Sequence, residues 1–199
     1  MVATMAFVSN DFGLASKRGA PRDSLSRIVL EACVAQDASG FRQFVERFQR
    51  PIIAYLARML SSQAPIEDLA QDVFLKAYRG FPAFDPATNI VTWIFTIATR
   101  VALDERKRRR ISSVSIDDAA AQAGSDRWKR WELQQAIEQA AETLSDDQRA
   151  AFVLAEFHNV SMEEIAMVLG VPENTVKTRI FRAKERLREA LAEYREERP

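Results

Sequence analysis

The sequence predicts an all-α protein of two small helical domains joined by a flexible linker, with a helix-turn-helix in the second domain. Apolar residues recur at the helical period of 3.6 residues along most of the chain after residue 24. Only 6 glycines and 7 prolines occur among 199 residues, which disfavours a sandwich or barrel. Residues 111–126 lack aromatic side chains and are rich in Ser, Ala and Asp, a composition typical of a linker. A short amphipathic helix at 117–123 is the alternative.

The first domain is predicted to span residues 24–110, after a flexible N-terminal arm at 1–23 that lacks the pattern of a secretory signal. We expect one helix near Ser24–Gln36, capped by Ser24 or Ser26. A second begins near Ser39, and Pro51 should kink it or restart it. A third begins at Pro65 with acidic residues in its first turn. A fourth covers 91–110, after a loop with two prolines.

The second domain is predicted to span residues 127–199. Ser145 and Ser161 are candidate N-caps, and Ser161 with Glu164 has the spacing of a capping box, in which each side chain satisfies the other residue's free backbone donor. The expected helices are Asp126–Glu142, Ser145–Asn159, Ser161–Leu169 and Pro172–Arg195.

The segment "SMEEIAMVLGVPENTVKTRI", residues 161–180, has the pattern of a helix-turn-helix. Ala166 is small where two helices must approach each other. Gly170 follows four residues later, where the turn needs a permissive backbone. Val176 lies six residues further, on the apolar side of the next helix. This arrangement pushes the second helix outward, where it can enter a DNA major groove.

The last helix has one apolar stripe and two basic flanks. At 100° per residue the stripe contains Val176, Ile180, Ala183, Leu187 and Leu191. Basic flanks can bind phosphates while the first turns meet base edges. A solvated amphipathic helix is the alternative, but the preceding turn favours DNA binding. The flanks are Lys177, Lys184 and Arg188 on one side and Arg179, Arg182 and Arg186 on the other, with Thr178, Phe181 and Arg182 facing outward.

The formal net charge is zero, but its distribution is uneven. Residues 24–110 hold 13 Lys and Arg against 9 Asp and Glu, whereas residues 111–199 hold 12 against 17. The positive charge is local, in "ERKRRR" at 105–110 and in the last helix, and such patches bind phosphate. One cysteine and one histidine exclude an internal disulfide and a Cys/His zinc site. The sequence contains no run of 18 apolar residues, so we expect no membrane span.

Two blocks of this sequence resemble the extracytoplasmic-function (ECF, group 4) sigma factors of bacterial RNA polymerase. "EFHNVSMEEIAMVLGVPENTVKTRIFRAKERLREAL" is similar to their C-terminal region 4, which reads the −35 element. "IEDLAQDVFLKAYRGF" and "VTWIFTIATRVALDERKRR" are similar to their N-terminal region 2, which binds core polymerase and opens the −10 element. The resemblance covers about residues 25–195, in the expected order.

The resemblance implies site residues for each role. The −35 contacts would be Thr175, Lys177, Thr178, Arg179, Phe181, Arg182, Lys184 and Arg186. The −10 contacts would be Thr88, Asn89, Thr92 and Trp93, which hold a flipped base and the melted junction, and Arg106, Lys107, Arg108, Arg109 and Arg110, which hold phosphates. The alternative for Trp93 is that its ring is part of the hydrophobic core. The clamp helices of the polymerase β′ subunit would be contacted by Asp68, Leu69, Gln71, Asp72 and Phe74, for which a solvated acidic helix face is the alternative.

The sequence departs from the family pattern at two places. Relatives often carry an Arg-Asn pair where this chain has Thr99-Arg100, and "TNIVTW" replaces the commoner "SSFRTW". The resemblance assigns no role in strand opening to Thr99 or Arg100. It implies binding to the β′ clamp helices and β flap of core polymerase, to promoter DNA and to an anti-sigma factor, without a cofactor. The chain ends soon after the last helix, so we expect control from outside it.

Three other functions compete with the expected one, a cytoplasmic stress-response sigma factor that performs no chemistry itself. A sigma-like decoy would bind an anti-sigma factor but not DNA, and the intact "ERKRRR" and "VKTRIFRAK" argue against it. An ordinary helix-turn-helix repressor leaves "IEDLAQDVFLKAYRGF" unexplained. An enzyme would need a phosphate-binding glycine loop, a nucleophile with its base, or a metal cluster. None of these is found in the sequence, and His158 is interpreted as structural.

Overall fold

The structure is a computed structural model that describes residues 25–60, 64–85, 88–112 and 137–196. Within these ranges every regular element is a helix, which confirms the predicted all-α class. The predicted arm, most of the predicted linker, the alternative helix at 117–123 and the first part of the predicted helix Asp126–Glu142 lie outside the described residues. The elements are α1 (Arg27–Val34), α2 (Ala38–Met59), α3 (Ile66–Gly80), the 3-10 turn η2 (Phe81–Ala83), α4 (Ile90–Ser112), a helical stretch at 137–142, α6 (Asp146–Phe157), α7 (Met162–Leu169) and α8 (Glu173–Glu196).

The starts of the first two helices follow local capping chemistry. Of the two predicted caps for α1, Ser26 is the one used, and its hydroxyl accepts a hydrogen bond from the backbone N–H of Val29. Helix α2 begins at Ala38, which agrees with the start predicted near Ser39, and its N-cap is Asp37. The Asp37 carboxylate accepts from the backbone N–H groups of Ser39 and Gly40 at 2.8 and 3.1 Å. Aspartate is among the residues that cap helices best.

Helix α2 continues through Pro51 without restarting, contrary to one of the two predicted outcomes. Proline removes a backbone donor and costs about 3 kcal/mol inside a helix. The residues after it, Ile52, Tyr55 and Leu56, are fully buried. Burial of three large apolar side chains contributes more than the proline costs, which explains why the helix continues.

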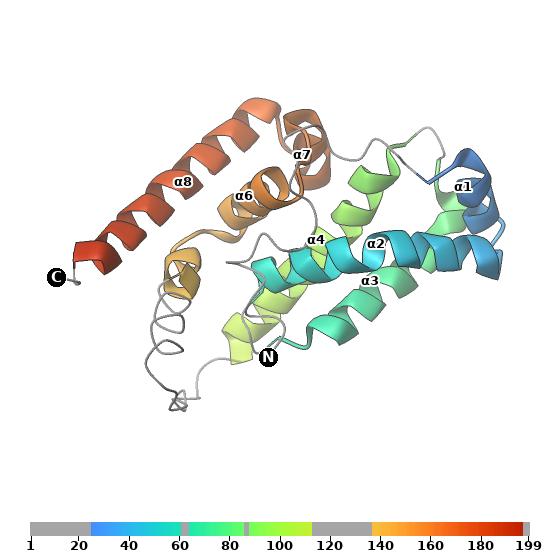
Figure 1. The fold of residues 1–199 in the computed structure, drawn as a ribbon, viewed down its shortest axis with the longest axis horizontal. Helices are drawn as coiled ribbons and strands as arrows, with labels where there is room; N and C mark the ends of the chain where they lie inside the picture. The colour runs from blue at the N-terminus through green and yellow to red at the C-terminus, as the bar shows by residue number, and fades with distance from the viewer. Residues whose placement is uncertain (1–24, 61–63, 86–87, 113–136, 197–199) are drawn as a thin grey trace.

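The N-terminal helices, α1 to α4, enclose an aromatic core. Phe44 lies at its centre, with ring centroids 5.0 Å from Phe48, 4.9 Å from Phe81 and 5.9 Å from Phe74. Helices α2, α3 and α4 pack against one another, and α1 crosses the end of α2 (Figure 1). Gly40 is needed at that crossing, because a Cβ atom there would lie 2.6 Å from the Cβ of Ala32.

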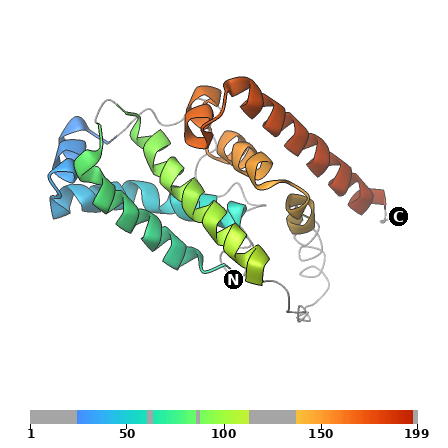
Figure 2. The same cartoon turned by 180° about the vertical axis from the view of Figure 1, so that it is seen from behind.

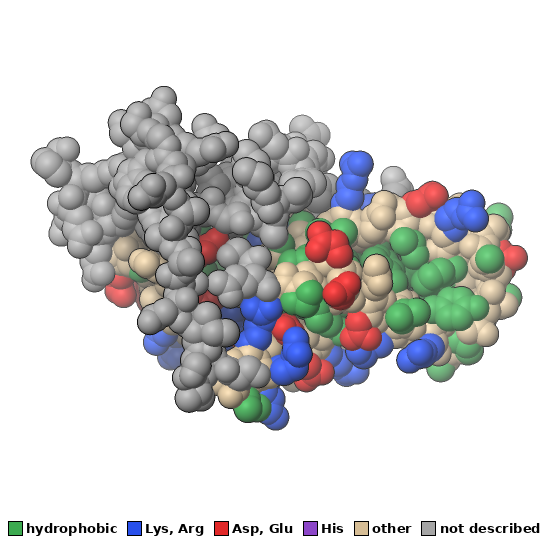
Figure 3. All heavy atoms as spheres, turned by 90° about the horizontal axis from the view of Figure 1, so that it is seen from below, with side chains coloured by type: hydrophobic (Ala, Val, Ile, Leu, Met, Phe, Trp, Pro, Cys, Tyr) green, Lys and Arg blue, Asp and Glu red, His purple; other side chains and the backbone are tan. Residues whose placement is uncertain are grey.

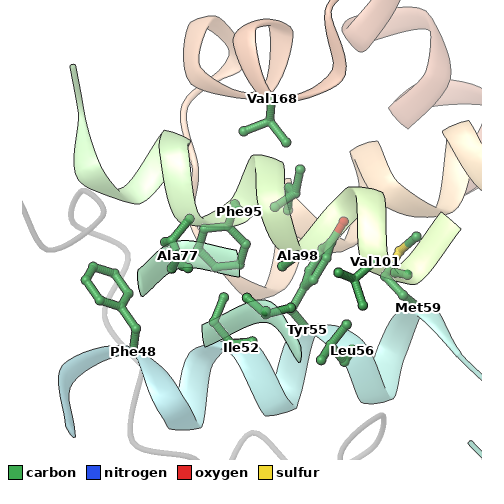
Figure 4. Close-up of a cluster of buried hydrophobic side chains, with 14 of the residues drawn as sticks. Phe48, Ile52, Tyr55, Leu56, Met59, Ala77, Phe95, Ala98, Val101 and Val168 are labelled. Carbon is green, nitrogen blue, oxygen red and sulfur yellow. The ribbon is translucent and has the colours of Figure 1, made fainter. Parts of the chain in front are cut away.

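The C-terminal helices, residues 137–196, pack directly on the N-terminal ones. Helix α7 contacts α4 and α6 contacts α2, while α8 forms the outer edge and packs on α6 and α7 (Figures 1 and 2). Side chains from both parts belong to one apolar cluster. In the close-up, Val168 of α7 points toward Phe95 and Ala98 of α4 (Figure 4). The sequence predicted two domains but gave no indication of this contact between them.

Candidate nucleic-acid interface

The start of α4 carries the predicted base-binding residues, and it touches the C-terminal helices. The Asn89 side chain accepts from the backbone N–H of Val91 at 2.8 Å, as a cap would, and donates to Glu164 of α7 at 2.6 Å. Thr88 is exposed, and its backbone N–H donates to the carbonyl of Asp85. The exposed Asn89 side chain is therefore able to form hydrogen bonds, but its amide nitrogen already donates to Glu164.

Thr92 and Trp93 lie deeper than Thr88 and Asn89. Thr92 is buried, and its hydroxyl has no hydrogen-bond partner among the described residues. The Trp93 ring is partly buried, with centroids 4.9 Å from both Phe81 and Phe84. This packing favours the core alternative for Trp93, and its stacking on a melted junction stays a prediction.

In the basic cluster, Arg106 to Arg110 at the end of α4, the four arginines are engaged by carboxylates. Glu105 is buried and accepts hydrogen bonds from Arg108 and Arg109, both at 2.7 Å. These hydrogen bonds hold the pKa of Glu105 below its usual value, and the bond from Arg108 has the larger effect on it. Arg110 donates to Asp146 of α6 at 2.6 Å. Lys107, Arg108 and Arg110 are the exposed members of this cluster.

Arg106 lies at the junction between the two parts of the chain. Its side chain is only 9% exposed. Its guanidinium donates to the carbonyl of Met59 at 3.0 Å, to Asp146 at 2.5 Å and to Glu142 at 3.3 Å. In this arrangement Arg106 cannot reach a phosphate unless the junction opens, so its DNA contact stays a prediction.

Arg149 of α6 converges on the same carbonyl from the C-terminal side. It donates to Met59 at 3.4 Å and to Glu142 at 3.0 Å. Burial lowers the pKa of Arg149 below the usual arginine value. Burial alone would raise the pKa of Glu142, but Arg149 and Arg106 together hold it below its usual value. Glu142 is thus a charged bridge between two buried guanidinium groups.

The predicted helix-turn-helix is present at residues 162–196. Ser161 and Glu164 form the predicted capping box, and Ser145 forms a second one with Gln148. Gly170 has a φ of 64°, a left-handed conformation that a side chain disfavours, and it ends α7. Four residues of the predicted stripe on α8 are buried as expected, namely Val176, Ile180, Ala183 and Leu187.

The polar faces of α8 are used unequally. Arg179 pairs with Asp147 at 2.6 Å, Lys184 pairs with Glu156 at 2.7 Å, and Arg186 donates to the carbonyl of Thr143 at 2.7 Å. The ammonium nitrogen of Lys177 lies 4.0 Å from a carboxylate oxygen of Glu173. Thr175 is partly buried. Thr178, Phe181 and Arg182 are exposed, with Phe181 at 61%. The three residues predicted to face outward on α8 are therefore exposed, and their contact with the −35 element stays a prediction.

The predicted polymerase face on α3 is part polar surface and part core. Asp68 and Gln71 are exposed, Leu69 is partly buried, and Asp72 forms an ion pair with Lys76. Phe74 is buried and its ring packs edge-on against Phe44. Seen from the α3 side, acidic side chains gather next to an apolar area (Figure 3).

The sequence did not indicate the contacts of Arg58 and His158 at the junction, although the burial of His158 agrees with the structural role predicted for it. The imidazole of His158 lies between two rings of the N-terminal helices, with centroids 5.7 Å from Tyr55 and 5.0 Å from Phe95. The guanidinium carbon of Arg58 lies 4.4 Å from the centroid of the Phe157 ring. The one available signal was the acidic surplus after residue 110, which includes Glu142 and Asp146.

Neither a metal cluster nor a membrane-spanning segment is found where the chain is described. No group of three or more His, Cys, Asp or Glu side chains among the described residues can hold a metal ion. None of the described helices is long and apolar enough to cross a bilayer.

Comparison with known proteins gives the same assignment for both halves. The family models of sigma-70 region 2 and sigma-70 region 4 match residues 44–111 and 134–187. The RNA polymerase sigma-H factor of Pseudomonas aeruginosa is 33% identical over 82% of this chain and 92% of its own. The ECF sigma-E factor of Escherichia coli is 30% identical over 80% of this chain and 90% of its own.

Two solved structures resemble the fold. The Bartonella quintana sigma factor RpoE, in complex with the anti-sigma factor NepR, superposes with a TM-score of 0.60 at 31% identity, covering 76% of this chain and 96% of that one. CnrH, in complex with the cytosolic domain of CnrY, superposes with a TM-score of 0.65 at 23% identity, covering 83% and 96%. The latter likeness concerns the fold alone.

Proposed function

The chain belongs to the extracytoplasmic-function sigma factors, and on that premise we propose how its surfaces divide the work of transcription initiation. Helix α3 binds core RNA polymerase, with Asp68, Gln71 and Asp72 on its polar face. The outward face of α8 reads the −35 element through Thr178, Phe181 and Arg182. The loop before α4 and the basic cluster at its end bind the −10 region.

One observation carries this proposal: both sigma regions occur on one chain in the family's order, and the reading face of α8 is exposed. Exposed Thr, Phe and Arg side chains on a helix that follows a tight turn suit base edges and thymine methyl groups in a major groove. A repressor would need the helix-turn-helix but not region 2.

The protein's role is selection of DNA, without chemistry of its own. Polymerase forms the phosphodiester bonds, and the sigma factor supplies position and strand opening. The site of action would be the cytoplasm, where core polymerase and promoter DNA are found. The described residues offer polar and basic surfaces to these two partners, in keeping with that role.

We also propose control by an anti-sigma factor. The support is the likeness to the sigma factor that was solved in complex with NepR. An inhibitor that binds both parts of the chain would cover the α3 and α8 surfaces together. Residues on these surfaces that are exposed here, such as Asp68 and Arg182, are the ones it would protect.

Transcription in vitro tests the proposed function. Purified protein with core polymerase is incubated with genomic DNA that includes the upstream region of its own gene, and the 5′ ends of the RNA are mapped. We expect defined start sites that core polymerase alone does not use. Absence of any defined start, while the protein still binds an anti-sigma factor, would favour the decoy.

A further inference from the structure

The outward face of α8 extends one turn further toward the N-terminus than Thr178, to Asn174. Asn174 is exposed, and it lies four residues before Thr178 and eight before Arg182, which are exposed as well. Residues four apart lie on one face of a helix. Asn174 also comes two residues before the buried Val176, about 200° away around the helix axis. Asn174 therefore lies on the side of α8 that is opposite its packing side.

The side-chain amide of Asn174 forms no hydrogen bond with any described residue. Its backbone carbonyl, in contrast, accepts a hydrogen bond from the Thr178 hydroxyl at 2.9 Å. That bond uses the only proton of the hydroxyl, so Thr178 offers an acceptor and a methyl group. Arg182 carries donors alone, and Phe181 is apolar. Of these four exposed residues, Asn174 is the one whose side chain offers both a donor and an acceptor.

A local structural role does not account for this asparagine. Asparagine near the start of a helix commonly accepts a hydrogen bond from a backbone N–H. The first helical bonds of α8 run from Thr175 and Val176 to the carbonyl of Pro172, at 2.9 and 3.2 Å, and the Asn174 amide takes no part. At the start of α4, in contrast, the Asn89 side chain accepts from a backbone N–H at 2.8 Å. The amide of Asn174 is therefore available to a partner outside the chain.

The amide group of asparagine matches the edge of adenine. In the major groove adenine presents an acceptor at N7 and a donor at N6, so one amide can form two hydrogen bonds with it at once. In helix-turn-helix proteins the first residues of the second helix are the ones that contact base edges. Asn174 is the second residue of α8, which begins at Glu173. Its position and its chemistry both suit base recognition.

We propose that Asn174 is a specificity-determining residue of this chain, which selects adenine at one edge of the −35 element. The inference rests on the proposed function for the role of α8. Asn174 and Arg182 are eight residues apart, which is about 12 Å along the helix axis. That length corresponds to roughly three base pairs at about 3.4 Å each. The selected adenine therefore lies roughly three base pairs from the base that Arg182 contacts.

Asn174 and Glu173 provide a matched pair of variants. Both are exposed and lie in the first turn of α8, so alanine changes the start of the helix in a similar way at each. Glu173 lies on the flank beside the buried stripe, with a carboxylate oxygen 4.0 Å from the ammonium nitrogen of Lys177. Glu173→Ala removes a negative charge near DNA and should strengthen binding to every sequence by a similar factor. Asn174→Ala, in contrast, should change the preference at one base position.

The test uses holoenzyme made from core polymerase and the full chain. The probes are duplexes of a promoter mapped in the transcription assay, with the −35 element and its flanks randomised, and the bound fraction is sequenced. We expect the wild type and Glu173→Ala to enrich adenine at one position by at least about fivefold, and Asn174→Ala to lose this enrichment. Asn174→Asp keeps the shape of the side chain but lacks the amide donors, so it should lose adenine as well. Circular dichroism should show the same helix content in all variants.

Adenine enrichment that persists in Asn174→Ala would overturn the inference. A uniform loss over all base positions would overturn it as well, because that is the signature of a phosphate contact. Arg182→Ala separates this failure from failure of the proposed function. If Arg182→Ala changes the −35 preference while Asn174→Ala does not, the function stands and Asn174 is not a specificity residue. If the wild type initiates at no defined start, the proposed function fails and the inference fails with it.

Discussion

The two basic surfaces of this sigma factor, at the end of α4 and along α8, differ in what faces them. At the end of α4, Arg106 and Arg110 are bound by carboxylates from the other part of the chain. On α8, the paired Arg179 lies to one side of a face where Thr178 and Arg182 are open. Similar clusters of positive charge in the sequence thus become one covered surface and one exposed surface. The packing of the neighbouring helices decides which of the two clusters stays exposed.

The largest effect is expected from a substitution on the buried side of α8, opposite its exposed face. Val176 is fully buried on the packing side of α8. Val176→Asp would leave an uncompensated charge there and cost on the order of 3–5 kcal/mol of unfolding free energy. Loss of helical circular dichroism and of hydrogen-exchange protection in α7 and α8 would measure it. Arg182→Ala, on the opposite face, is the control, and equal loss in both variants would contradict the assignment of faces.

The junction between the two parts should make stability depend on pH. Burial, with a smaller contribution from Arg58, lowers the pKa of His158 from 6.5 to about 3. Below pH 6.5 the unfolded chain takes up a proton that the folded chain refuses, so stability is fully present above that pH and declines as pH falls. The decline should approach 1.4 kcal/mol per pH unit, as an order-of-magnitude limit for about one proton.

Denaturant unfolding at pH 7, 6 and 5 would measure this decline above the range where carboxylates titrate. His158→Gln removes the titrating group and should flatten the profile, although its overall stability will be lower. A slope that is unchanged in His158→Gln would show that another group is responsible.

The sequence predicted features that depend on local spacing. The burial of Val176, Ile180 and Ala183 follows from helical periodicity, and Ser161 with Glu164 forms a capping box because both lie within one turn. These contacts need no knowledge of the rest of the fold.

The contacts across the junction could not be predicted in the same way. Arg106 reads as one of a run of solvated cations, yet it meets Asp146, which is 40 residues away along the chain. Trp93 reads equally well as a stacking platform or a core residue, and only the positions of Phe81 and Phe84 show that the ring is packed. Such outcomes depend on tertiary packing, which periodicity and composition do not encode.

A moderate effect should distinguish the free from the paired cations of α8. Arg182 is exposed on the outward face, whereas Lys184 is paired with Glu156. Arg182→Ala should weaken binding to −35 DNA by about 1–3 kcal/mol, the size of one good base contact. Lys184→Ala should cost less, because its charge is already partly neutralised. Gel shifts of the holoenzyme on promoters with intact and altered −35 elements would measure both, and a larger loss in Lys184→Ala would reverse the two roles.

The smallest effect concerns the basic cluster at the end of α4. Lys107 and Arg108 are two of its exposed members, and Arg109 remains to neutralise Glu105 when they are removed. We expect these cations to bind phosphates, so alanine at both positions should weaken every promoter by a similar factor. Each lost duplex contact should reduce the slope of log affinity against log salt by about 0.9.

Promoter binding measured over a series of salt concentrations, with several −10 sequences, checks this expectation. Arg27 is a suitable control, because it is an exposed cation on α1 paired with Glu31, and Arg27→Ala should leave the slope unchanged. Phosphate contacts position a protein on DNA without selecting among bases, so the ranking of −10 sequences should be the same in the double variant and the wild type. A changed ranking with an intact salt slope would mean that this cluster reads bases, and the comparison with α8 would then be between two reading surfaces.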